Sequence, residues 1–175
     1  RKGKTMEYQG ETRIYVACLA SYNNGILHGK WIDATQDEEA IWDEVKQMLT
    51  NSPTEVAEEW TIHDYEGFYG FRLTEFSSFE SVAKFGAFFK DHGSLGASLI
   101  GYYGSIDDAK EALNERYIGR FDSVAEFAEC HLEECFTIPE GLRPYIDYQA
   151  FARDLEINDL VVISGEDGCH LFWNR

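Results

Sequence analysis

Acidic side chains recur at helical spacing along this sequence, and they fix which faces its helices can bury. The clearest row lies in residues 122–133, where the steps between acids are four, three and four; its members are Asp122, Glu126, Glu129 and Glu133. Residues so spaced are neighbours on a helix surface, where like charges repel by roughly a few tenths of a kcal/mol per pair. No lysine relieves the row, so this face is predicted to point to water. The opposite, apolar face carries Val124, Phe127, Ala128, His131, Leu132 and Cys135.

Similar clusters of carboxylates occur on other predicted helices. On a single helix, such a cluster is most simply a solvated face that keeps the protein soluble. Its recurrence on several helices favours a function for the charge itself. The predicted acidic surface comprises Asp37, Glu38, Glu39, Asp43, Glu44, Glu55, Glu58, Glu59, Glu75, Glu80, Asp107, Asp108, Glu111, Glu115, Asp122, Glu126, Glu129, Glu133 and Glu134.

The whole chain is strongly acidic, with 32 acidic and 15 basic side chains and a formal net charge of −17. A protein that binds nucleic acid needs the opposite sign. Residues 14–175 alone carry 30 acidic and 11 basic side chains. Duplex DNA holds one negative charge per about 1.7 Å of axis, so this net charge matches that of roughly 32 Å of duplex. In domains arranged in a row, the carboxylates would trace a phosphate-like track.

Composition excludes several classes of protein. With 44% hydrophobic and 15% aromatic residues, the chain can bury a core. It has no apolar run of about 20 residues and no signal-peptide pattern, which predicts a soluble, cytoplasmic protein with no membrane contact. Its four cysteines form no CxxC pair, so neither a disulfide framework nor a metal site is expected. Residues 1–13 begin with Arg1 and are interpreted as a truncated leader or cloning remnant.

The N-terminal part of the chain is predicted to form an α+β domain over residues 14–75. Asn24-Gly25 favours a type I′ hairpin turn between strands at 14–22 and 26–32. Thr35 and Glu38 form a capping-box pattern at the start of a helix. That helix is predicted over 36–49, with Ile41, Val45, Met48 and Leu49 buried, followed by a short helix from Pro53 to Trp60 and a strand over 61–71.

Residues 76–115 are predicted to form a helical middle domain, and residues 116–175 a second α+β domain. Three helix starts are expected in the middle, at Ser77 with Glu80, at Ser94, and at Ser105 with Asp108. The last domain is predicted to hold a strand at 117–121, helices at 123–135 and 142–155, and a hairpin of 160–164 with 169–173. The fold class is therefore α+β, with three small domains in series, elongated and acidic.

Catalytic patterns are weak, and neither a catalytic residue nor a cofactor is predicted. His63 and Asp64 are adjacent in a predicted strand, so their side chains would point to opposite faces. His131 lies on an apolar helix face, where a histidine is usually a core residue. The sequence has no Gly-rich phosphate loop, nucleophile elbow, HExxH motif or EF-hand loop. Hydrolysis by a pair of carboxylates is a less favoured alternative.

Three segments together resemble the ArdA-type antirestriction proteins, which are acidic mimics of DNA. They are YVACLASYNNGILHGKWIDA at 15–34, IHDYEGF at 62–68 and YIDYQAFARDL at 145–155, in the same order and spacing as in that family. The resemblance covers nearly all of the chain after Arg13.

The resemblance implies three small domains that dimerise through the C-terminal one into a curved rod imitating bent B-form DNA. It implies a homodimer encoded on mobile genetic elements, and a partner: the methyltransferase core of a type I restriction–modification enzyme, formed by specificity and modification subunits. The family's antirestriction motif maps to residues 134–148, next to the expected dimer interface. Its matching residues are Pro139, Leu142, Tyr145, Ile146, Asp147 and Tyr148.

Two points stay open at the level of sequence. Ordinary helix packing and a direct interface role explain Tyr145, Ile146 and Tyr148 equally well. The acidic surface also fits a chaperone-like protein that binds basic proteins of any shape. A DNA mimic differs from such a polyanion because its shape matters, and from a hydrolase because no single carboxylate is indispensable.

Overall fold

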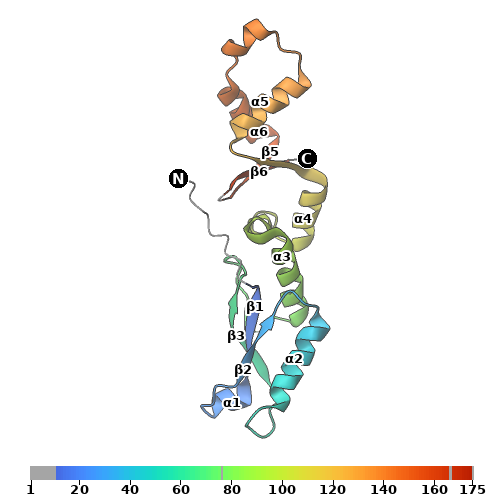
Figure 1. Cartoon of the computed structure of the whole chain (residues 1–175), viewed down its shortest axis with the longest axis vertical. Helices are drawn as coiled ribbons and strands as arrows, with labels where there is room; N and C mark the ends of the chain where they lie inside the picture. Colours follow the sequence, from blue (N-terminus) through green and yellow to red (C-terminus); the bar gives the residue numbers. More distant parts are fainter. Residues whose placement is uncertain (1–10, 76, 166, 175) are drawn as a thin grey trace. The chain divides into compact units, whose positions relative to one another are not determined.

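The computed structural model describes residues 11–75, 77–165 and 167–174 (Figure 1). The described chain is a mixed α+β structure with two antiparallel sheets of three strands each. It divides into two compact units, one ending at Ala97 and one beginning at Ser98, here called the N-terminal and C-terminal units. The α+β class is therefore confirmed, whereas the division into three domains at residues 76 and 116 stays a prediction.

The sheet of the N-terminal unit has the strand order β2-β1-β3. Strand β1 covers Arg13–Cys18, β2 covers Gly29–Asp33 and β3 covers Trp60–Glu66. Ile14 pairs with Ile32 across β1 and β2, and both side chains are fully buried. Helix α2 packs against these two strands, which explains why alternate positions of β1 are apolar.

The connection between β1 and β2 differs from the predicted hairpin turn. Strand β1 ends at Cys18 and is followed by a short helix, α1 (Leu19–Asn23). Gly25 has a φ of 73°, but Asn24 has a φ of −92°, so the turn is not type I′. The buried hydroxyl of Ser21 hydrogen-bonds to residues of a distant loop, which draws the chain out of the sheet. The predicted continuation of the first strand to residue 22 was wrong.

Helix α2 (Glu38–Thr50) confirms the predicted helix, with Ile41, Val45 and Met48 buried as predicted, whereas Leu49 is only half-buried. Its cap was predicted wrongly. The Asp37 carboxylate, rather than the Thr35 hydroxyl, accepts the N–H of Ala40 at 2.8 Å. The backbone N–H of Thr35 donates to the Asp33 carboxylate in the turn before the helix.

The short helix predicted from Pro53 to Trp60 is absent from the described residues of this segment, which form turns and an irregular stretch. The Ser52 hydroxyl accepts the N–H of Thr54 at 3.2 Å, and this local bond competes with helix formation. Strand β3 ends at Glu66, five residues before the predicted end. Gly67 follows with a φ of 77° and lies against the backbone of Thr12, where a side chain would not fit.

Helix α3 (Phe79–Tyr103) contains the first two helices predicted for the middle of the chain. Gly93 interrupts it with φ 54° and ψ −139°, immediately before the predicted start at Ser94. The first turn is capped by Ser78, whose hydroxyl accepts the N–H of Ser81, whereas Ser77 instead accepts the N–H of Thr74. The predicted cap at Ser77 was therefore displaced by one residue. Helix α4 (Ile106–Glu111) begins at the predicted Ser105 cap.

The C-terminal unit is built on a sheet with the order β4-β6-β5. Its strands are β4 (Tyr117–Phe121), β5 (Leu160–Gly165) and β6 (Gly168–Trp173), which confirms the predicted strand and the predicted hairpin. A π-helical turn, η1 (Ala112–Arg116), leads from α4 into β4. Helices α5 (Val124–Cys135) and α6 (Tyr148–Asn158) pack against each other. Their shared core consists of Val124, Phe127, Ala128, Ala152, Leu155, Leu160, Cys169 and Leu171.

The helix predicted over residues 142–155 begins later than expected. Residues Glu140–Tyr145 form a 3-10 helix, η2, that contains Pro144. Helix α6 starts only after Asp147, whose carboxylate accepts the N–H of Ala150 at 2.9 Å. Proline disfavours the α-helical conformation in the residue before it, which accounts for a 3-10 helix rather than the predicted α-helix at this point. In the described part of the chain, no helix is both long and apolar enough to cross a bilayer.

Candidate functional site

The predicted acidic surface is accessible to solvent. All of its members are exposed except Glu44, which is half-buried. Several of these carboxylates pair with a basic side chain: Asp43 with Lys46, Glu44 with Lys30, Glu80 with Lys84, Glu111 with Arg116, Asp122 with Arg120, and Glu133 with Arg143. Among the described residues, the following have no ion pair: Asp37, Glu38, Glu39, Glu55, Glu58, Glu59, Glu75, Asp107, Asp108, Glu115, Glu126, Glu129 and Glu134.

The acidic row of α5 is partly neutralised by arginines from outside the helix. Arg120 of β4 lies 3.9 Å from the Asp122 carboxylate, and Arg143 of η2 pairs with Glu133. The sequence shows no lysine within the row. Arg120 is only two residues from Asp122 in sequence, whereas the pairing of Arg143 with Glu133 joins two separate elements and was not predicted. Glu126 and Glu129, in the middle of the row, keep their charges unpaired within the described structure.

Glu44 differs from the other carboxylates because it is built into the fold. Burial alone would raise the pKa of Glu44, but hydrogen bonds from Lys30 and Gln36 outweigh burial and lower it. The Lys30 ammonium lies 2.7 Å from this carboxylate and the Gln36 amide lies 2.8 Å from it. Glu44 is therefore a charged link between β2 and α2 and is the member of the acidic surface least available to a partner.

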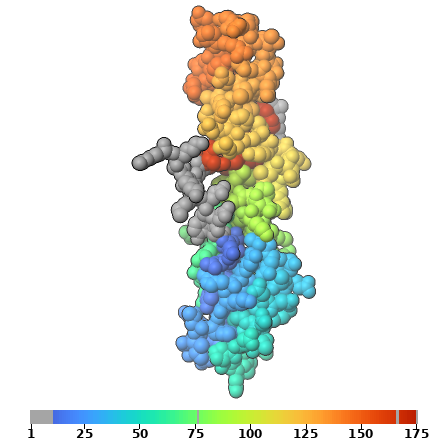
Figure 2. Space-filling model, viewed as in Figure 1, coloured from blue at the N-terminus to red at the C-terminus, as the bar shows by residue number. Residues whose placement is uncertain are grey.

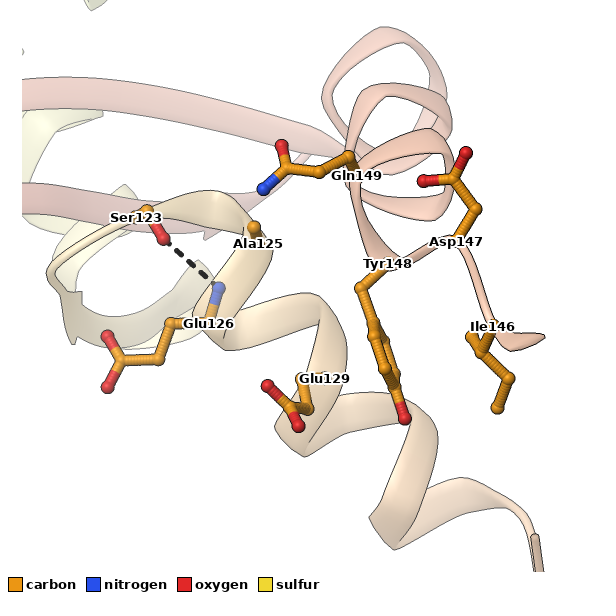
Figure 3. A pocket seen from close by; sticks show the side chains of 8 residues that line it. All are labelled: Ser123, Ala125, Glu126, Glu129, Ile146, Asp147, Tyr148 and Gln149. Atoms are coloured by element: carbon orange, nitrogen blue, oxygen red, sulfur yellow. Dashed lines mark hydrogen bonds between the residues drawn. The ribbon is translucent and has the colours of Figure 1, made fainter. Parts of the chain in front are cut away.

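An open groove of about 510 Å³ lies between the first turns of α5 and α6 (Figure 3). Figure 3 shows the ring of Tyr148 directed towards the part of α5 that carries Glu129. Ser123 caps α5 and Asp147 caps α6, so the two helix starts meet at the groove. The groove is lined by Ser123, Ala125, Glu126, Glu129, Ile146, Asp147, Tyr148 and Gln149. It joins two predicted features, since it combines carboxylates of the α5 row with the end of the antirestriction motif.

The remaining motif residues lie on the surface of the C-terminal unit. Leu142 is 56% exposed and Tyr145 is 84% exposed, and η2 buries none of its residues. Pro139 is exposed, whereas Ile146 and Tyr148 are half-buried. Ordinary helix packing therefore does not explain Tyr145, because its side chain is free of the core. It remains a sufficient explanation for Tyr148, which lies in the first turn of α6.

His63 and Asp64, which are adjacent in sequence, do not form a catalytic pair. Strand β3 has a β-bulge at His63, between the pairs Tyr15–Asp64 and Val16–Ile62. The alternation of side chains between the two faces of the sheet is interrupted there, and both His63 and Asp64 are exposed. The ring of His63 makes an edge contact with Tyr22 at 4.7 Å. His131 stacks on Phe127, which confirms its expected place beside the core.

One side-chain cluster was not predicted. The Tyr117 hydroxyl lies 2.9 Å from Nδ1 of His170, and Nε2 of the same ring lies 3.4 Å from the Asp167 carboxylate. Burial and the Asp167 charge raise the pKa of Tyr117. The cluster joins β4 to the hairpin of β5 and β6. Tyr117 is 53 residues from His170 in sequence, so only the strand register reveals their contact. Among the described residues, no three His, Cys, Asp or Glu side chains are placed to bind a metal ion.

The sequence model of the antirestriction protein ArdA matches residues 14–167, which is most of the chain. No curated protein shows significant similarity to the sequence.

Proposed function

Because the chain belongs to the ArdA family of antirestriction proteins, we propose that it mimics bent B-form DNA and occupies the DNA-binding channel of type I restriction–modification enzymes. In this role it blocks both restriction and modification. The family consists of non-enzymatic inhibitors of type I enzymes. The observation that carries the proposal is the large number of exposed, unpaired carboxylates in both units.

The mechanism follows from the electrostatics of DNA binding. A DNA-binding channel is lined by Lys and Arg, and much of its affinity for DNA comes from the release of counterions. Exposed carboxylates compete for the same basic side chains. Six members of the acidic surface are already paired within the chain, so the unpaired members, such as Glu39, Glu115 and Glu129, supply this interaction.

Two properties of the inhibitor follow from the same reasoning. Carboxylates present charge but no base edges, so inhibition should extend to enzymes with different recognition sequences. Binding should also weaken as salt rises, because exposed charges are screened. Each single carboxylate contributes little, and the loss of several is needed for a large effect.

We also propose that two copies associate through the antirestriction motif. Phe136, Leu142 and Tyr145 are 62%, 56% and 84% exposed within a short segment of the C-terminal unit. Exposed apolar and aromatic side chains close together are typical of a protein interface. The adjacent groove contributes Ile146 and Tyr148 to the same surface.

The test is displacement of a fluorescent DNA duplex from a purified type I methyltransferase core, titrated with this protein at about 50 and 200 mM salt. Stoichiometric displacement that weakens with salt is expected. No displacement by the folded protein at micromolar concentration would overturn the proposal.

A pair of charge variants separates a DNA mimic from a general polyanion. The first changes four unpaired members of the acidic surface to Gln: Glu39, Glu115, Glu129 and Glu134. The control changes four exposed acids outside that surface and outside the antirestriction motif to Asn or Gln: Glu11, Asp91, Asp154 and Glu156. Both variants lose four charges, and a mimic should be weakened much more by the first. Equal weakening, together with tight binding to polylysine, would favour a chaperone-like binder of basic proteins.

A further inference from the structure

Exposed apolar side chains gather at one end of the N-terminal unit. Tyr22 and Ile26 are 55% and 41% exposed, and Leu27 and Val56 are 76% and 80% exposed. These four residues, here called the apolar tip, come from two connections. Tyr22 lies in α1, Ile26 and Leu27 lie in the loop that follows it, and Val56 lies in the loop after α2. Figures 1 and 2 show α1 and the loop that follows α2 at the same end of this unit.

Hydrogen bonds hold the two loops of the apolar tip together. The Ser21 hydroxyl lies 2.9 Å from the Ser52 hydroxyl and 3.0 Å from that of Thr54. The N–H of Leu19 donates to the carbonyl of Glu59 at 3.0 Å. Because Ser21 is fully buried, these bonds are shielded from water. These bonds hold the two segments of the apolar tip next to each other.

The backbone of Val56 is strained in a way that the local packing does not explain. Its φ is 58°, a conformation that is a genuine outlier for a β-branched residue. The side chain is 80% exposed, so no burial in the core compensates for the strain. Strained residues of this kind cluster at binding sites. A glycine would adopt this conformation without strain. The presence of a valine instead indicates that its side chain contacts something outside the chain.

Carboxylates flank the apolar tip. Glu55, Glu58 and Glu59 lie in the same loop as Val56, are exposed, and have no ion pair among the described residues. An exposed apolar patch with a polar rim is typical of a protein interface. A second copy of the tip does not fit, because docking two tips would bring these carboxylates together. The complementary surface is an apolar depression surrounded by Lys or Arg.

We propose that the apolar tip docks into such a depression beside the DNA-binding channel of the restriction–modification enzyme. This inference rests on the proposed function and adds a contact that DNA itself cannot make. Apolar burial depends little on salt, whereas the contacts of carboxylates with basic side chains weaken as salt rises. The tip therefore supplies an anchor that keeps the inhibitor bound at salt concentrations at which a purely ionic mimic would be displaced.

The test uses the full chain and the displacement assay described above. Val56→Gly removes the side chain and places a residue suited to the positive φ, so little loss of fold stability is expected. Leu27→Ser removes a second exposed side chain. Ile157→Ser is the matched control, because Ile157 is also 76% exposed but lies on α6 of the C-terminal unit. Thermal unfolding of every variant shows whether the fold is retained.

The double change of Val56 and Leu27 should weaken displacement about tenfold or more at both salt concentrations, leave the salt dependence unchanged, and exceed the effect of Ile157→Ser. Unchanged displacement by the folded double variant would overturn the apolar anchor while leaving the proposed function intact. A loss confined to low salt would also overturn it, because that result would indicate an ionic contact. Failure of the unaltered protein to displace DNA would overturn the proposed function and, with it, the partner named for the tip.

Discussion

The backbone N–H of Asp122 donates a hydrogen bond of 2.8 Å to the carboxylate of Glu126, so two members of one acidic row are joined at the start of α5. The N–H of Glu126 in turn donates to the Ser123 hydroxyl at 3.2 Å. The second bond satisfies a donor that the first turn of a helix leaves without an intrahelical partner, and the first bond ties the residue before the N-cap to that turn. Glu129, one turn further on, has no such bond in the described structure. Carboxylates that look equivalent in sequence therefore have different roles.

Substitutions at Glu126 and Glu129 should separate these roles. Glu126→Ala should lower the free energy of unfolding by about 0.3–1.5 kcal/mol, because it removes the bond to the Asp122 N–H. Glu126→Gln should keep most of that stability, since the amide oxygen can still accept the bond. Glu129→Gln should leave stability unchanged. Urea unfolding measures all three, and a cost at Glu129 as large as that of Glu126→Ala would contradict the assignment.

The contact between Lys30 and Glu44 predicts a dependence of stability on pH. The pKa of Glu44 is lower than its ordinary value of 4.5, so the folded state favours the charged carboxylate. Its contribution is complete above the ordinary pKa and is lost as the pH falls through the lowered value. Because both side chains are partly exposed, the contribution should be below about 1 kcal/mol. Glu44→Gln should therefore destabilise the protein at pH 7 and converge with the unaltered protein at low pH, as measured by urea unfolding across pH. An equal difference at every pH would rule out this ionic contribution.

Two glycines of α3 should respond in opposite ways to alanine. A Cβ on Gly86 would lie 2.0 Å from the carbonyl oxygen of Ala34, a backbone atom that cannot move aside. Gly86→Ala should therefore cost at least about 2 kcal/mol of unfolding free energy. Gly101 has open space around its Cβ position, so Gly101→Ala should stabilise the helix by about 0.5–1 kcal/mol. Thermal unfolding measures both, and a Gly86→Ala protein as stable as the original would show that α3 does not approach Ala34 so closely.

Exposed residues of the antirestriction motif should control the oligomeric state. Changing Leu142 and Tyr145 together to Ser should shift the protein from dimer to monomer at micromolar concentration, because both side chains are more than half exposed and neither supports the core. Analytical ultracentrifugation measures the change. Ile157→Ser, equally apolar but outside the motif, should leave the dimer intact. A dimer that survives the double change would place the interface elsewhere.

Much of the secondary structure could be predicted because local patterns dictate it. The apolar stripe of α2, the Ser105 cap, and the hairpin of β5 and β6 each depend on residues that are close together in sequence. The errors occurred where a distant residue decided the local conformation. The Ser21 hydroxyl binds Ser52 and Thr54, about 30 residues away. These residues therefore form a helical turn, where the sequence predicted the end of the first strand.

The sequence by itself determined that the protein is acidic, that its helices turn rows of carboxylates to water, and that it resembles the family to which the chain belongs. Those properties depend on residue type and spacing, which need no three-dimensional information. Only the tertiary structure decided that Glu44 and Glu133 are neutralised, because Lys30 and Arg143 reach them from other elements. It alone also brought Val56 and Leu27 to one end of a unit, since backbone conformation and hydrogen bonds between loops determine which distant side chains share a surface.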